Sequence, residues 1–181
     1  MKTKVLKWSG IAIALILFVG HIVFSASINR AEVASQDALS IEYRKQDGNY
    51  HIETSNSLAH LVIYPGALVE PAAYLPLAEK IAIQGFDVHI IRMPFHLSIL
   101  DSDAVESLDL DDGKPVFIGG HSLGGVAAST QVSKHPDDYD GLILIASYPR
   151  IGVDLSGWDK PVLTITASND GVIDEELFEE G

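Results

Sequence analysis

One segment constrains the fold more than any other. An apolar run of strand length, Pro115–Ile118, leads through a glycine-rich turn directly into Leu123–Lys134, which reads as a helix rich in small residues. The turn between them is Gly119-Gly-His-Ser-Leu-Gly-Gly125, which contains the pattern Gly-x-Ser-x-Gly centred on Ser122. Such a passage from strand to helix predicts a sharp bend with a serine at its apex.

The glycines of this bend have a steric reason. Side chains at Gly120 and Gly124 would collide when the chain turns within a few residues, and glycine relieves the crowding. The hydroxyl of Ser122 is then expected to project above the sheet at the amino end of the helix. Backbone N–H groups there, that of Leu123 first, can stabilise a developing oxyanion. The alternative is a glycine-rich turn with an idle serine.

Other apolar runs alternate with helical patterns. The expected strands are 60–64, 87–92, 141–146 and 161–167, the expected helices are 71–84 and a short acidic 101–108, and an antiparallel hairpin is expected from 39–44 and 50–54. This alternation predicts an α/β fold with a mostly parallel sheet covered by helices on both faces. Ligand sites in such sheets lie beyond the carboxyl ends of the strands.

Residues 1–28 have the composition of a targeting segment. Lys2, Lys4 and Lys7 precede an apolar core from Ile11 to Phe24 that is followed by small residues. This pattern predicts a signal peptide or a membrane anchor, with the anchor slightly favoured over the cleaved signal, and disfavours a buried core helix. Because the lysines come first, the remainder is expected on the extracytoplasmic side, either anchored or secreted.

The rest of the chain reads as a spacer, 29–38, and one domain, 39–181. Residues 29–181 hold all 25 Asp and Glu but nine of the twelve Lys and Arg, a net charge of −16. Such a charge disfavours nucleic acid and anionic lipid as partners. The chain has no cysteine, which excludes disulfides and thiolate metal sites.

A serine nucleophile needs a base that is oriented by a carboxylate. Asp170 follows the last expected strand in an Asn-Asp-Gly turn and is the candidate acid, although aspartate is also common in ordinary turns. Asp154, Asp159 and Asp174 are weaker candidates.

The base is harder to assign, because no histidine follows His135. His51, His60 and His89 fall within expected strands and favour structural roles, which leaves His96 as a weak candidate. The simplest interpretation is that a last strand, a helix and the catalytic histidine lie beyond residue 181, so that this domain is C-terminally incomplete.

A second oxyanion donor is expected from the loop after the first parallel strand, Tyr64-Pro-Gly-Ala-Leu68, where we favour the N–H of Ala67. An ordinary strand–helix loop is the alternative. The mouth of the site is expected to include Phe95, His96, Tyr148 and Pro149.

Taken together, these segments resemble the α/β-hydrolase superfamily, and most closely a single-domain bacterial branch similar to dienelactone hydrolases. The resemblance is carried by Tyr64-Pro-Gly-Ala-Leu-Val69 with Pro71–Tyr74, Arg92-Met-Pro94, the Gly119–Gly125 turn and Ala146-Ser-Tyr-Pro149. It implies serine-dependent hydrolysis, commonly of carboxylic esters, without metal or organic cofactor. It also implies Ser122 as nucleophile and Asp170 as acid, and the missing histidine is its one departure.

The leading hypothesis is therefore a serine hydrolase that transfers an acyl group from a small ester to water. Two alternatives remain open. One is a catalytically inactive binding module on a hydrolase scaffold, and the other is an acyltransferase that uses the same residues.

Overall fold

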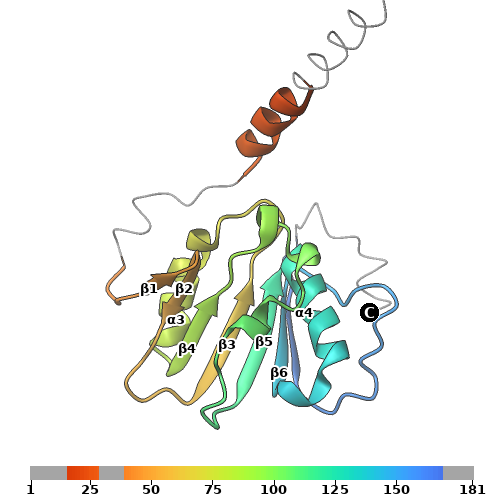
Figure 1. Ribbon diagram of the computed structural model, residues 1–181. Coiled ribbons are helices and arrows are strands. Elements are labelled where there is room, and N and C mark those ends of the chain that lie inside the picture. Colours follow the sequence, from red (N-terminus) through yellow and green to blue (C-terminus); the bar gives the residue numbers. More distant parts are fainter. Residues whose placement is uncertain (1–15, 29–38, 169–181) are drawn as a thin grey trace, which may run out of the picture.

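The computed structural model describes residues 16–28 and 39–168, and the described residues of the domain form a seven-stranded sheet in the order β1-β2-β4-β3-β5-β6-β7 (Figure 1). The strands are β1 (Arg44–Gln46), β2 (Asn49–Ile52), β3 (Ala59–Tyr64), β4 (Phe86–Ile90), β5 (Val116–His121), β6 (Gly141–Ile145) and β7 (Val162–Ile165). β1 and β2 pair antiparallel, as do β2 and β4, and the other neighbours pair parallel. The predicted mostly parallel sheet is confirmed.

Two helices cover opposite faces of this sheet (Figure 1). They are α3 (Leu75–Ala82) and α4 (Leu123–Lys134), and the connections carry short 3-10 helices: η1 (Pro71–Tyr74), η2 (Pro94–His96), η3 (Ser98–Leu100), η4 (Ala104–Ser107) and η5 (Pro136–Asp138). Side chains alternate between the faces of a strand. In β3, Leu61 and Ile63 therefore pack on the α3 side, whereas Val62 and Tyr64 pack on the α4 side.

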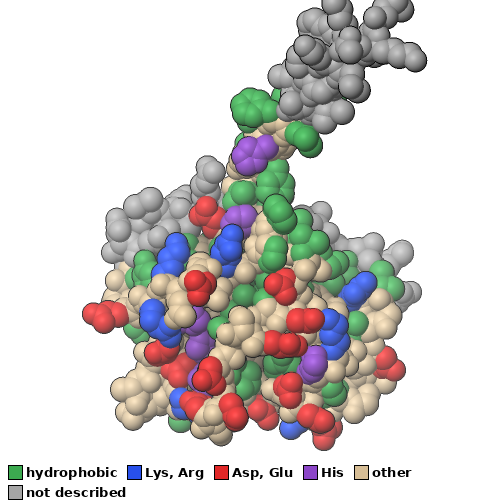
Figure 2. Space-filling view, in the orientation of Figure 1, with side chains coloured by type: hydrophobic (Ala, Val, Ile, Leu, Met, Phe, Trp, Pro, Cys, Tyr) green, Lys and Arg blue, Asp and Glu red, His purple; other side chains and the backbone are tan. Residues whose placement is uncertain are grey.

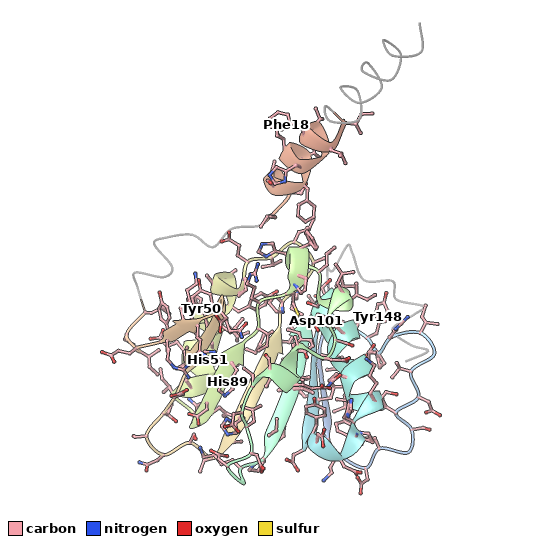
Figure 3. The ribbon with its side chains drawn as sticks, viewed as in Figure 1. Phe18, Tyr50, His51, His89, Asp101 and Tyr148 are labelled. Carbon is pink, nitrogen blue, oxygen red and sulfur yellow. The ribbon has the colours of Figure 1, made fainter. Side chains whose placement is uncertain are left out.

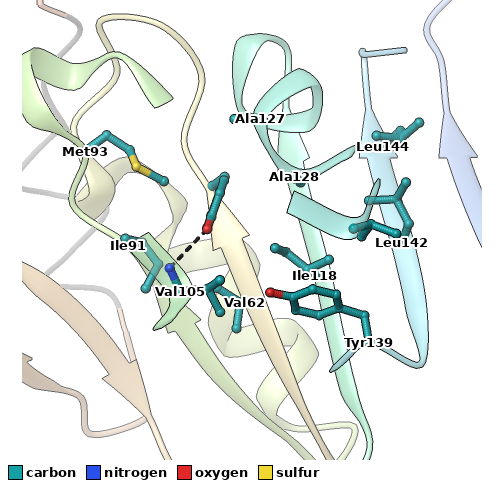
Figure 4. Close-up of a cluster of buried hydrophobic side chains, with 12 residues drawn as sticks. Val62, Ile91, Met93, Val105, Ile118, Ala127, Ala128, Tyr139, Leu142 and Leu144 are labelled. Carbon is teal, nitrogen blue, oxygen red and sulfur yellow. Dashed lines mark hydrogen bonds between the residues drawn. The ribbon is translucent and has the colours of Figure 1, made fainter. Parts of the chain in front are cut away.

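The core on the α4 side shows how small residues let this helix approach the sheet (Figure 4). Ala127 and Ala128 are buried against Ile118 and its neighbours in the sheet. At the edge of this cluster Tyr64 keeps its hydroxyl paired, because Oη accepts from the N–H of Val105 at 3.1 Å. Burial raises the pKa of Tyr64, so its hydroxyl stays protonated.

Three predicted elements differ most in extent. The helix expected over 71–84 is divided into η1 and α3, and the division falls just before Pro76, which has no N–H to donate to the preceding turn. The acidic helix expected over 101–108 is reduced to η4. The first strand of the hairpin, expected over 39–44, is β1 at Arg44–Gln46, so the prediction and the structure share only Arg44.

At the amino end, residues 16–26 are helical and most of their large apolar side chains are exposed. Among the described residues, no helix combines the length and apolarity that crossing a bilayer demands. Residues 1–15 of the predicted anchor and the spacer 29–38 lie outside the described residues.

Candidate active site

Ser122 is the single residue between β5 and α4, and its backbone is strained. Its φ of 52° and ψ of −125° lie in a region that residues with side chains rarely adopt. The N–H of Ser122 donates to the carbonyl of Ile145 at 2.9 Å, and its own carbonyl accepts from the N–H of Gly125 at 2.9 Å. The conformation is thus anchored from β6 on one side and from α4 on the other.

The two glycines of the motif are required by contacts between backbones. A Cβ on Gly120 would lie 2.2 Å from the carbonyl carbon of Gly124, and a Cβ on Gly124 would lie 2.0 Å from the carbonyl oxygen of Tyr64. The steric explanation given for this pair from the sequence is confirmed. The contact with Tyr64 also shows that the end of β3 touches the first turn of α4.

Ser147 is a buried support of the bend that the sequence reasoning did not single out. Its Oγ donates to the carbonyl of Ser122 at 2.7 Å, and a Cβ on Gly125 would lie 2.4 Å from that Oγ. The side chain therefore holds α4 and the bend against the end of β6. The only signals for it in the sequence are a small polar residue directly after a strand and a second glycine after the motif.

The loop after β3 lies against the same bend. The N–H of Gly66 donates to Tyr74 Oη at 2.8 Å, and Tyr74 Oη lies 3.0 Å from His121 Nδ1. Because burial raises the pKa of Tyr74, its hydroxyl stays protonated and can donate to that ring nitrogen. Tyr74 thus links the loop that contains Ala67 to the residue before Ser122.

Ala67 occupies the second position of a turn closed by a 3.3 Å hydrogen bond from the N–H of Val69 to the carbonyl of Gly66. Leu68, the third residue of the turn, has a φ of 58°. Leu123 is the first residue of α4, where N–H groups have no acceptor within the helix. The first turn of α4 contacts the backbone of Tyr64 and Pro65 at the start of this loop, and the oxyanion roles of Ala67 and Leu123 remain predictions.

Comparison with known proteins now assigns the family. Residues 60–180 match the profile described as the alpha/beta hydrolase family. The chain belongs to the alpha/beta hydrolase family. The resemblance to this superfamily inferred from the sequence is confirmed.

Solved structures agree with this family at the level of the fold. The chain superposes with a TM-score of 0.60 on TT1662 from Thermus thermophilus, at 14% identity, covering 78% of this chain and 81% of that one. A protein of Klebsiella pneumoniae described as a dienelactone hydrolase gives a TM-score of 0.56 at 14% identity, covering 78% of each chain.

Among curated proteins, the pimeloyl-[acyl-carrier protein] methyl ester esterase of Chromobacterium violaceum is 32% identical over 108 residues. The alignment covers 56% of this hydrolase-family chain and 42% of the esterase.

The other predicted site residues have different outcomes in this hydrolase fold. Asp170 and Asp174 lie outside the described residues. Asp154 and Asp159 are exposed in the connection between β6 and β7, where Asp154 accepts from the N–H of Ser156 at 2.9 Å as in an ordinary turn. His96 Nδ1 lies 3.3 Å from the carbonyl of Val69, so this ring nitrogen serves as a donor to the loop.

The expected mouth residues follow β4 and β6. Phe95 is 70% exposed with a φ of 51°, and Tyr148 and Pro149 are half-buried in the segment after β6 (Figure 3). Among the described residues, no group of three or more potential ligands is arranged to hold a metal ion.

Three buried histidines form a chain of hydrogen bonds across β2, β4 and β3, and Figure 3 labels two of them, His51 and His89. His51 Nδ1 lies 2.9 Å from His89 Nδ1, and His89 Nε2 lies 3.1 Å from His60 Nδ1. At the end of this series of hydrogen bonds, His60 Nε2 lies 3.0 Å from a carboxylate oxygen of Asp112. Their location in strands agrees with the structural roles expected from the sequence.

The carboxylate of Asp112 orients the hydrogen bonds among the three histidines. Hydrogen bonds from Lys114 and His60 lower the pKa of Asp112, which is therefore an acceptor. With neutral rings, His60 donates from Nε2 to that carboxylate and accepts at Nδ1, His89 donates from Nε2 and accepts at Nδ1, and His51 donates from Nδ1.

Acid should therefore destabilise the fold through His89. Burial first, and then the neighbouring His51 and His60, lower its pKa from 6.5 to about 4. The neutral ring contributes stability that is fully present above pH 6.5 and is lost as the pH falls toward 4. A shift of this size corresponds to about 3 kcal/mol of unfolding free energy.

Urea denaturation between pH 7 and 4.5 measures this loss. In His89→Gln, which keeps a donor and an acceptor but does not titrate, we expect a much flatter dependence of unfolding free energy on pH. His135→Gln, at a 43% exposed histidine after α4, is the matched control and should keep the wild-type slope. Identical slopes in wild type and His89→Gln would contradict the assignment.

Proposed function

We propose that this protein is a serine hydrolase that cleaves a carboxylic ester through an acyl-serine intermediate. The observation that carries the proposal is the strained backbone of Ser122 between β5 and α4, anchored by Ile145, Gly125 and Ser147. Strain of this kind persists only where surrounding contacts hold it, and it is concentrated at functional sites. A serine that served only as a turn would not need three such anchors.

The reaction follows from this placement. Ser122 Oγ attacks the ester carbonyl while its proton passes to a histidine base oriented by Asp170, and the N–H groups of Leu123 and Ala67 stabilise the oxyanion. Collapse of the tetrahedral intermediate breaks the bond to the alcohol, which leaves with the proton. Water then attacks the acyl-serine by the same route and releases the acid.

The curated relative supports an ester substrate, because that protein is named as a methyl ester esterase. The alignment includes less than half of that esterase, so we carry over the bond type and not the substrate. A further proposal concerns location: residues 1–28 hold the domain at a membrane, on the extracytoplasmic side, because the lysines precede the apolar core.

The decisive experiment is labelling of the full-length protein with a fluorophosphonate probe, followed by peptide mapping. We expect one adduct, on Ser122, because only a serine activated by a base reacts with such probes. Labelling at another serine would reject Ser122 as the nucleophile. Absence of labelling would favour the inactive binding module.

A further inference from the structure

Three exposed apolar side chains project from the segment that follows β4, at the carboxyl end of the sheet. Phe95 in η2 is 70% exposed, and Ile99 and Leu100 in η3 are 48% and 57% exposed. We call these three residues the apolar rim. Contiguous exposed apolar side chains are costly in water and commonly mark interaction surfaces.

The apolar rim is attached to the loop of the proposed site. The N–H of Leu68 donates to the carbonyl of His96 at 2.7 Å, and Ser98 Oγ donates to the carbonyl of Pro65 at 2.5 Å. Pro65 directly precedes the turn that contains Ala67, and Leu68 is the third residue of that turn. Whatever binds the rim is therefore held beside the proposed oxyanion donors.

The apolar helix of residues 16–26 lies next to the rim. The rings of Phe24 and Phe95 are 6.4 Å apart in an edge-to-face contact. Phe95 remains 70% exposed despite this contact, and Ile22 and Val23 of the helix remain 50% and 60% exposed. The helix thus extends the apolar surface without covering it (Figure 2).

The distribution of charge indicates what kind of partner fits. The domain is strongly acidic, yet residues 88–100, which include the rim, contain no Asp or Glu. In the face seen in Figure 2, most acidic side chains lie over the middle and the lower part of the domain. The rim residues, which precede Asp101, can approach an uncharged apolar phase, whereas the strongly acidic remainder of the domain is repelled by anionic surfaces.

We propose that the apolar rim lies against a lipid bilayer of zwitterionic composition and that the site takes its acyl ester from that bilayer. The choice of ester rests on the proposed function, whereas the membrane contact does not. A bilayer fits because the helix and the rim together form one exposed apolar surface, and such surfaces insert into the boundary between headgroups and acyl chains.

The absence of cysteine makes the contact directly measurable. Leu100→Cys is compared with Leu58→Cys, since Leu58 is 70% exposed but lies just before β3, at the opposite end of the sheet. Each variant of the full-length protein receives an environment-sensitive fluorophore and is bound to phosphatidylcholine vesicles that contain nitroxide-labelled lipid. We expect severalfold stronger quenching at position 100 than at position 58.

Equal quenching at the two positions, or stronger quenching at position 58, overturns the membrane contact whatever the fluorophosphonate result.

The second part of the proposal, that the ester comes from the bilayer, is tested with Leu100→Glu and Leu58→Glu. We expect only Leu100→Glu to slow hydrolysis of a long-chain ester in vesicles severalfold while hydrolysis of a soluble short-chain ester is unchanged. Equal rates on the vesicle ester reject the bilayer as the source of substrate. Missing fluorophosphonate labelling with the quenching difference intact rejects the hydrolase and leaves the membrane contact standing.

Discussion

Replacing Ser122 by alanine is expected to lower kcat/KM for a soluble ester by roughly 10⁴- to 10⁶-fold, the range seen when the nucleophile of a hydrolytic triad is removed. The reason is that the acyl-serine route disappears, and only binding and the oxyanion donors remain to favour the reaction. The loss should appear in kcat, since the hydroxyl acts on the reacting carbonyl rather than on ground-state binding.

The same substitution should leave the fold intact. Ser122 Oγ makes no hydrogen bond to any other described residue, and alanine meets the same backbone strain as serine, so the unfolding free energy should change by less than about 1 kcal/mol. Ser133→Ala, at an exposed serine of α4, is the matched control and should retain wild-type kinetics. Wild-type turnover in Ser122→Ala would rule out an acyl-enzyme at this position.

A larger effect on stability is expected from Gly124→Ala. The added Cβ would lie 2.0 Å from the carbonyl oxygen of Tyr64 and 2.6 Å from that of Pro65. Both atoms belong to the backbone and cannot rotate away, so β3 and α4 must separate. We expect a loss of about 4 kcal/mol of unfolding free energy or a failure to accumulate as folded protein, because overpacking at a rigid contact is among the most destabilising changes.

Gly157→Ala is the control for this prediction. No atom lies within 4 Å of a Cβ built on Gly157, which sits in the connection between β6 and β7. Its unfolding free energy in urea should stay within about 0.5 kcal/mol of wild type. If Gly124→Ala unfolded at the same urea concentration as Gly157→Ala, the inference that the bend is closely packed against β3 would be contradicted.

Several features of the candidate site could be predicted because they are local. The distance between Gly120 and Gly124 is set by a few residues of backbone, so their steric need can be read from the motif and is confirmed by the contacts. The order of apolar runs likewise predicts a parallel sheet, because each run must be buried on both faces. Pro76 illustrates the limit, since the pattern over 71–84 is helical although a proline divides it.

Other features depend on which strands become neighbours. His51 and His89 meet because β2 pairs with β4, and His60 joins them because β3 flanks the other edge of β4. Each histidine alone reads as an ordinary strand residue. Ser147 reaches the bend for a similar reason, because β6 lies beside β5.

The sequence by itself determined the strand, the bend at Ser122 and the following helix, because backbone sterics and apolar periodicity act over a few neighbouring residues. Only the tertiary structure decided which side chains anchor that bend, how the three histidines share their protons and where the apolar rim lies relative to the loop that contains Ala67. These contacts join residues that are 25 to 52 positions apart in the chain, from Ser122 with Ser147 to His60 with Asp112. Such distances are set by strand order and register, which no local pattern specifies.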